Sequence, residues 1–349
     1  MSVKTNVQDF WRHFCQKQEV IEQCLQDQDY ETLSDILNEL QDEVNRISGC
    51  SFFIEDVIEP LEMTFDPGPN KTCQYLASLL AQSAPKQVLK KWIVNDHLVE
   101  LSQKAIEAQI KIKEQVYTLP DFHVFYTVNE ENQSFSCFVY CPGFGIIDNT
   151  ENKKEMSMYL LELAIGQTYY EAYLQTIDFI DQPDPDMAFC NLIDFYDVIR
   201  DVVVKNKWKQ YKTPLDIYSV FQPREEAGHE TLRKDMKFIF STHPLLVEET
   251  LGNGQDVLLD LRSKEGDFGY MYYANPFTGK ENALFRQELS KKLDTMVSSK
   301  HAGKVIGGAI GSSFSYIDWI VYDEAEFEQM TESIKKQFEN KIELHYQSF

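Results

Sequence analysis

The sequence lacks the features that mark the best-known membrane and enzyme classes. No apolar run approaches the roughly 20 residues that a bilayer-spanning helix needs, and the N-terminal stretch MSVKTNVQDFWRHF has no uninterrupted apolar core of the kind found in secretion signals. The HExxH, GxSxG and GxxxxGK[ST] motifs are absent. We therefore expect a cytoplasmic protein outside the metalloprotease, α/β-hydrolase and P-loop classes.

Cysteine is present but lacks the spacing of a metal site. The seven cysteines are scattered and include no CxxC pair, which argues against a zinc ribbon or finger. Cys137 and Cys141 lie four apart on an expected strand, so they share a face but are too distant for simple pairing. The pattern predicts reduced thiols, no bound metal and no cofactor.

Basic residues are scarce. The chain has 33 Lys and Arg against 56 Asp and Glu, a formal net charge of -23. Such a field repels nucleic acid and anionic membranes and accelerates encounter with basic proteins. We expect no nucleic-acid or membrane partner and consider a basic protein partner. A second interpretation is that the acidic surface only keeps the protein dispersed.

The first 49 residues have the pattern of an antiparallel helix pair. Apolar side chains recur at helical spacing from Val7 to Ile47. Asp29 can cap the second helix and Gly49 can end it. Residues 1–49 are therefore predicted to form an N-terminal helical hairpin.

After residue 50, short alternating apolar runs replace this pattern, and an order of two strands, one helix and one strand recurs. The three expected units begin near Phe53, at Val124–Val128 and at Val257–Leu261, and the last ends in a glycine-rich strand. This order predicts an α+β fold with repeated ββαβ units whose helices pack on antiparallel sheets.

The best linker candidate is the DQPDPD segment, Asp181–Asp186, where two prolines interrupt the periodicity. Its carboxylates suggest a hard-cation site, but the prolines and the missing EF-hand glycine favour a charged linker. We place the boundary between Asp181 and Pro214, which gives α+β domains at 50–210 and 211–349.

The stretch from Lys304 to Tyr346 has the clearest order. Its glycines precede a strand rather than a helix, so they indicate close backbone crossing and not a phosphate loop. Asp323 and Glu326 have the spacing of a capping box, which predicts the start of a helix. A last strand is expected at Ile342, Leu344 and Tyr346.

This C-terminal region resembles uncharacterised bacterial cytoplasmic proteins of unknown function. The resemblance covers about the last two-fifths of the chain and rests on short motifs, which are here Tyr218, Leu232, Arg233, Asp235, Gly308, Gly311, Tyr316, Ile317 and Asp318. It implies a bacterial α+β protein and invites comparison with immunity factors for secreted toxins. It implies no activity and no catalytic residues.

Five residues form the candidate catalytic group: His229, Glu230, Arg233, Tyr316 and Asp318. Together they could supply acid and base groups and a guanidinium clamp around a pocket near His229 and Tyr316. The competing interpretation is a solvated turn that leads into a strand.

Aromatic residues beside acids suggest a recognition surface. The candidate binding residues are Asp194, Tyr196, Asp197, Asp318 and Trp319. Aromatic anchors among carboxylates suit a basic protein partner, although half-buried strands produce the same adjacency.

These observations favour an acidic protein-binding module, with an immunity-type inhibitor of a basic toxin or effector as its most specific form. The alternatives are an enzyme of unrecognised type and a scaffold that self-associates into a homo-oligomer.

Overall fold

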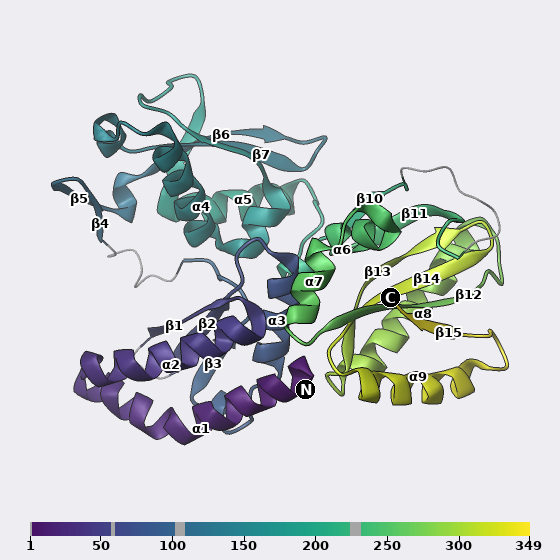
Figure 1. The fold of residues 1–349 in the computed structure, drawn as a ribbon. Helices are drawn as coiled ribbons and strands as arrows, with labels where there is room; N and C mark the ends of the chain where they lie inside the picture. Colours follow the sequence, from purple (N-terminus) through teal and green to yellow (C-terminus); the bar gives the residue numbers. More distant parts are fainter. Residues whose placement is uncertain (1, 57–59, 102–108, 224–231) are drawn as a thin grey trace. The chain divides into compact units, whose positions relative to one another are not determined.

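The computed structural model describes residues 2–56, 60–101, 109–223 and 232–349, and its fold is mixed helix and sheet (Figure 1). The predicted α+β class is confirmed. The chain forms two compact units: unit 1 joins Met1–Asp96 to Tyr218–Phe349, and unit 2 is His97–Ile217. The ranges expected from the sequence divide the chain elsewhere, because the two ends of the chain pack together in unit 1.

The N-terminal helix pair is present as predicted. Helix α1 (Val3–Asp27) and helix α2 (Tyr30–Ser48) run side by side (Figure 1). The Asp29 carboxylate accepts a hydrogen bond from the Thr32 amide, and Gly49 ends α2 with a left-handed φ of 78°. Both end signals read from the sequence are confirmed.

A three-stranded sheet follows in unit 1. Strands β1 (Ser51–Asp56) and β2 (Leu61–Asp66) pair antiparallel, and β2 pairs in parallel with β3 (Trp92–Asn95). Helix α3 (Lys71–Gln82) connects β2 to β3, and its side chains from Thr72 to Leu80 are buried. The order is the predicted ββαβ.

Unit 2 repeats this order and this pairing. Its principal elements are β6 (His123–Asn129), β7 (Ser134–Tyr140), α4 (Thr150–Tyr173), β8 (Leu174–Phe179), β9 (Ala188–Asn191) and α5 (Phe195–Lys205). The strand order is β8-β7-β6-β9, with β7 and β8 parallel. Both helices lie on one side of β6 and β7 (Figure 1). A separate hairpin is formed by β4 (Gln109–Ile112) and β5 (Gln115–Thr118).

The C-terminal part of unit 1 is a six-stranded sheet in the order β10-β11-β13-β14-β12-β15, antiparallel throughout. Helices α8 and α9 cover one face of it. Its strands are β10 (Ser219–Phe221), β11 (Met236–Ser241), β12 (Asp267–Ala274), β13 (Gly303–Gly311), β14 (Phe314–Val321) and β15 (His345–Ser348). Its helices are α6 (Pro244–Glu248), α7 (Asp256–Ser263), α8 (Gly279–Ser298) and α9 (Glu324–Phe338).

Short helical turns complete the described elements. They are the 3₁₀ turns Val88–Lys90, Leu119–Asp121, Pro142–Ile146, Leu192–Asp194 and Pro214–Asp216, and the π-turn Glu249–Asn253.

The third expected ββαβ unit does not form. Its first strand, Val257–Leu261, is part of helix α7, because Leu258 and Leu261 lie three residues apart and are both buried on one helix face. In addition, β14 lies between β12 and β13, so these two strands of the expected unit are not neighbours in the sheet. The sheets also differ from the expectation, since the two small ones contain the parallel pairs described above.

The predicted linker and the predicted last strand also differ from the structure. Asp181–Asp186 connects β8 to β9 inside unit 2 and is not a linker between domains, because β9 pairs with β6. The last strand begins only at His345, while Ile342 and Leu344 are buried in the helix-side core. The predicted cap of α9 is confirmed, since the Asp323 carboxylate accepts a hydrogen bond from the Glu326 amide.

Candidate functional site

Three of the five candidate catalytic residues meet in unit 1, on the face of the six-stranded sheet opposite α8 and α9. Asp318 on β14 lies directly across from Tyr270 on β12, and Tyr316 lies across from Tyr272. Arg233 approaches from the segment that precedes β11. His229 and Glu230 lie outside the described residues, so the predicted group is tested only in part.

Arg233 and Asp318 form a buried ion pair. Arg233 Nη1 donates to Asp318 Oδ1 at 2.6 Å, and the two side chains are 7% and 0% exposed. The guanidinium carbon also lies 4.7 Å from the centre of the Tyr270 ring, in a cation–π contact. An ion pair removed from water in this way depends on both partners, because either charge alone would be buried without compensation.

Asp235 holds Tyr316 and the turn between β13 and β14. The Tyr316 hydroxyl donates to Asp235 Oδ1 at 2.5 Å, while Asp235 Oδ2 accepts from the amides of Ser313 at 3.0 Å and Phe314 at 2.9 Å. The Arg233 amide donates to the Tyr316 hydroxyl oxygen at 2.9 Å. Burial, together with the bond to Asp235, raises the pKa of Tyr316, so the phenol stays protonated.

The glycines of β13 explain how these groups fit. A Cβ on Gly308 would lie 2.0 Å from the Tyr316 carbonyl oxygen, and one on Gly311 would lie 2.1 Å from Asp235 Oδ2. Arg286 Nη1 uses the space beside Gly308 to donate to the Tyr316 carbonyl at 3.2 Å. Close backbone approach, as predicted, is therefore the reason for this glycine-rich strand.

The hydrogen-bonding capacity of the Arg233 group is only partly used. Among the described residues, nothing accepts from Arg233 Nε or Nη2 and nothing donates to Asp318 Oδ2. The other polar atoms of the Asp235 side chain and of the Tyr316 hydroxyl are used within the group. The arrangement is a buried network that joins β14 to the start of β11.

The candidate binding residues are divided between the two units. Asp318 and Trp319 are both 0% exposed in unit 1, and Trp319 packs in the core beneath α8 and α9. Asp194, Tyr196 and Asp197 lie in unit 2 at the start of α5. The five residues do not form one surface patch, because two of them are enclosed in unit 1.

The group in unit 2 is partly accessible. The Tyr196 ring lies 4.7 Å from that of Tyr169 on α4, and burial together with the negative charge of Glu100 raises the pKa of Tyr196 to about 12. Asp197 pairs with Arg200 at 2.6 Å, and Asp194 is exposed. Tyr196 is half-buried.

A second aromatic surface in unit 2 was not predicted from the sequence. We call it the outer aromatic face; its residues are His123, Phe125, Phe138, Tyr140 and Phe189. The strand register places them on the side of the sheet opposite α4 and α5, since each pairs with another member or alternates with core residues. None belongs to the helix-side core cluster.

The rings of this face contact one another. Phe189 stacks on Phe125 with ring centres 5.3 Å apart, and Tyr140 meets Phe125 edge-on at 6.4 Å. Phe125 is thereby buried, whereas Phe189 is 61% exposed. Strand β9, which carries Phe189, is only four residues long and lies next to a proline-rich loop, so its alternation was too short to recognise.

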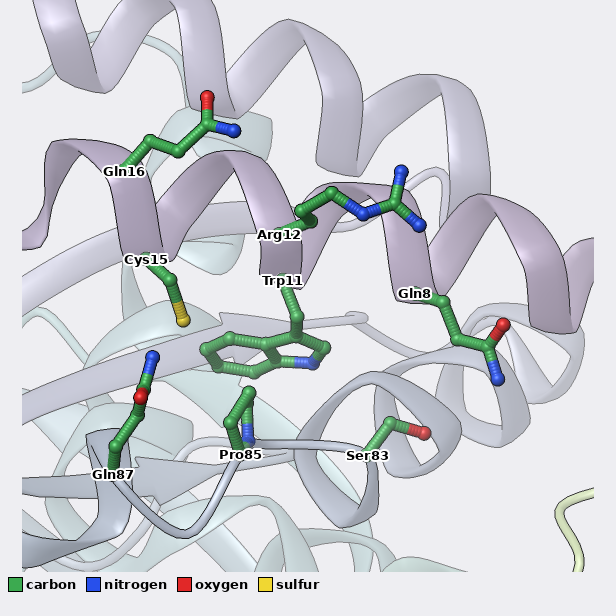
Figure 2. A pocket seen from close by; sticks show the side chains of 8 residues that line it. All are labelled: Gln8, Trp11, Arg12, Cys15, Gln16, Ser83, Pro85 and Gln87. Atoms are coloured by element: carbon green, nitrogen blue, oxygen red, sulfur yellow. The ribbon is translucent and has the colours of Figure 1, made fainter.

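A pocket of about 490 Å³ lies on α1 in unit 1. Figure 2 shows the Trp11 indole and the Cys15 thiol directed towards the loop that holds Pro85 and Gln87. Trp11 is a core residue, because its indole N–H donates to the Leu80 carbonyl at 2.8 Å and its rings pack against Phe10. The rest of the lining is mainly glutamine amides, without an acid–base pair.

Comparisons of the chain with models of known protein families, with curated proteins and with solved structures find no match. Within the described ranges, no helix has the length and apolar character of a bilayer span. In the same part of the chain, no three His, Cys, Asp or Glu side chains gather as metal ligands would.

Proposed function

We propose that this chain is an acidic protein-binding module that recognises a basic protein through the outer aromatic face of unit 2. The observation that supports the proposal is Phe189, which is 61% exposed on an edge strand and rests on a second ring. Rigid aromatic anchors of this kind supply much of the energy of protein interfaces. The partner class that fits is a basic toxin or effector, which the chain would cap as an immunity-type inhibitor.

Charge around the face supports a basic partner. Asp178 lies opposite Phe138 in the register, on the same side of the sheet, and Asp184 and Asp186 precede Phe189 in the β8–β9 connection. Among the described residues none of these three carboxylates pairs with Lys or Arg. Lysine and arginine side chains form ion pairs with carboxylates and cation–π contacts with aromatic rings. The net charge of -23 would add long-range attraction.

The enzyme alternative has no comparable support, because the Tyr316 hydroxyl is buried and donates to Asp235. Self-association through the same face is a distinct outcome of the experiment that follows.

The test is photo-crosslinking. Benzoylphenylalanine, an aromatic photo-crosslinker, replaces Phe189 in the full chain, which is irradiated in lysate of its host at low and at high salt. Its matched control replaces Tyr159 on α4, an aromatic residue that is also 61% exposed. We expect one basic protein, identified by mass spectrometry, to be linked from position 189 at low salt only, since salt screens attraction between exposed charges.

Two results contradict the proposal. Equal products from positions 189 and 159 would mean that the outer aromatic face is not a specific surface. A product of twice the chain mass and nothing else would mean that the face mediates self-association.

A further inference from the structure

Two cysteines far apart in sequence lie together in unit 1. Cys50 directly follows Gly49, the residue that ends α2, and Cys73 is in the first turn of α3. A Cβ on Gly49 would lie 3.1 Å from Cys73 Sγ, which places the Cys73 sulfur against the backbone beside Cys50. Cys50 Sγ donates to the Cys73 carbonyl oxygen at 3.5 Å, so the Cys50 thiol lies directly against the second cysteine.

The surroundings of Cys73 favour its thiolate. The adjacent Cys50 thiol lowers the pKa of Cys73, and the nearby Lys264 ammonium lowers it further, against the opposing effects of burial and of Asp260, the ion-pair partner of Lys264. Cys73 is also at the third position of a 12-residue helix, where the positive end of the helix dipole stabilises negative charge. Lys264 is close in space, since its Cε would lie 3.4 Å from a Cβ on Gly49.

Cys50 has the opposite character. Its side chain is 0% exposed, and the bond to Cys73 together with burial raises the pKa of Cys50. Cys73 is 6% exposed, so it is the more accessible of the two. Cys73 is therefore suited to be the attacking thiolate, and Cys50 is suited to be the resolving thiol.

We infer that Cys50 and Cys73 are a redox-active dithiol that a peroxide converts to an intrachain disulfide. The Cys73 thiolate attacks one oxygen of hydrogen peroxide, the O–O bond breaks and hydroxide leaves, so that Cys73 becomes a sulfenic acid. Cys50 then loses its proton and attacks the Cys73 sulfur, the S–O bond breaks and water leaves. The dithiol gives up two electrons and the peroxide becomes two molecules of water.

The position of α3 gives the disulfide a structural consequence. Thr72 and Tyr75 contact His243 and Thr242, which connect this helix to the C-terminal half of unit 1. A bond from Cys73 to Cys50 would tie the same helix to the end of the helix pair. Oxidation is therefore expected to raise the melting temperature of unit 1, because the crosslink restricts the unfolded chain.

The experiment maps thiols in the intact chain. The reduced protein is treated with hydrogen peroxide, free thiols are blocked with N-ethylmaleimide, and peptides are separated without reductant. We expect a linked peptide that joins Cys50 to Cys73, which dithiothreitol separates. Cys15 and Cys190 are both partly exposed and serve as internal controls that remain unlinked.

Variants test the assigned roles. In Cys50→Ser the resolving thiol is absent, so dimedone should trap a sulfenic acid at Cys73. Lys264→Gln should slow this labelling about three- to tenfold, because a lost cation raises the thiol pKa by up to about one unit. Lys291→Gln, which changes an exposed lysine of α8, should leave the rate unchanged.

Two outcomes overturn the inference. One is a wild-type chain in which Cys15 and Cys190 are oxidised or alkylated before Cys73 and no Cys50–Cys73 peptide forms. The other is dimedone labelling of Cys73 that does not change with Lys264→Gln. The wild-type map needs no variant, so it stands even if a substitution prevents folding.

Discussion

Two sheet faces in this chain have the same kinds of side chain and use them in opposite ways. In unit 1, Tyr270 and Tyr316 lie beside Arg233 and Asp318, which form a buried ion pair with each other. In unit 2, rings on the outer aromatic face cover one another but leave Phe189 on the surface. Residue type alone does not distinguish a structural network from a binding surface; burial and hydrogen-bond pairing do.

Substitutions on the two faces should therefore affect different properties of the protein. A substitution in the buried Arg233 group of unit 1 should reduce stability. A substitution of Phe189 on the outer aromatic face should reduce binding and leave stability nearly unchanged.

The largest effect is expected from Asp318→Ala. Removal of this carboxylate leaves the Arg233 guanidinium buried without compensation, which should lower the free energy of unfolding by about 3–5 kcal/mol. The matched control is Asp197→Ala, whose exposed pair with Arg200 should contribute less than about 1 kcal/mol. Urea denaturation followed by tryptophan fluorescence measures both, and equal losses would mean that the unit 1 pair is not buried.

The second-largest loss of stability is expected from Gly308→Ala. The new Cβ would meet the Tyr316 carbonyl oxygen at 2.0 Å, and φ at this position is 152°. We expect a loss of about 2–3 kcal/mol in the same urea experiment. Gly145→Ala is the control, because nothing lies within 4 Å of a Cβ there; a similar cost at both positions would refute the close approach of β13 to β14.

The stability of unit 1 should also depend on pH, because of His243. Burial lowers the pKa of His243 to about 4, whereas an exposed histidine titrates near 6.5. As the pH falls from 6.5 towards 4, the unfolded chain binds a proton that the folded unit does not, so stability is lost over that window. The loss should reach about 2–3 kcal/mol for wild type.

His243→Gln isolates this contribution, since glutamine does not titrate. Denaturation midpoints measured at several pH values should fall less steeply below pH 6.5 in the variant than in wild type. Parallel pH profiles would show that His243 does not cause the loss.

The smallest stability effect is expected from Phe189→Ser. The side chain is mostly exposed, so its removal should lower the free energy of unfolding by less than about 1 kcal/mol. Thermal unfolding followed by circular dichroism measures this, with Tyr159→Ser as control. A loss comparable to that of Asp318→Ala would make Phe189 a core residue and remove the distinction between the two faces.

Local features of the fold could be predicted from the sequence, because their physical causes are local. The caps at Asp29, Gly49 and Asp323 depend on one side chain or one backbone angle near the helix end. The short stretch Val257–Leu261 could not be assigned by periodicity, since five apolar-rich residues fit a strand or a helix.

Groups assembled from distant segments could be predicted only in part. Arg233, Tyr316 and Asp318 were named together as candidates, but nothing in the sequence indicates that Asp235 anchors Tyr316 or that the group is buried. The outer aromatic face depends on the register of β6, β7 and β9, and the contact of Cys50 with Cys73 depends on how α3 meets the end of α2. Tertiary packing decides these features.

The most direct measurement is isothermal titration of the chain with the partner identified by crosslinking. We expect Phe189→Ser to weaken binding at least about 30-fold, because one aromatic anchor is worth about 2 kcal/mol, and we expect wild-type affinity to fall as salt rises. Tyr159→Ser should bind as wild type does. If Phe189→Ser binds the partner as tightly as wild type, the outer aromatic face is not the recognition surface.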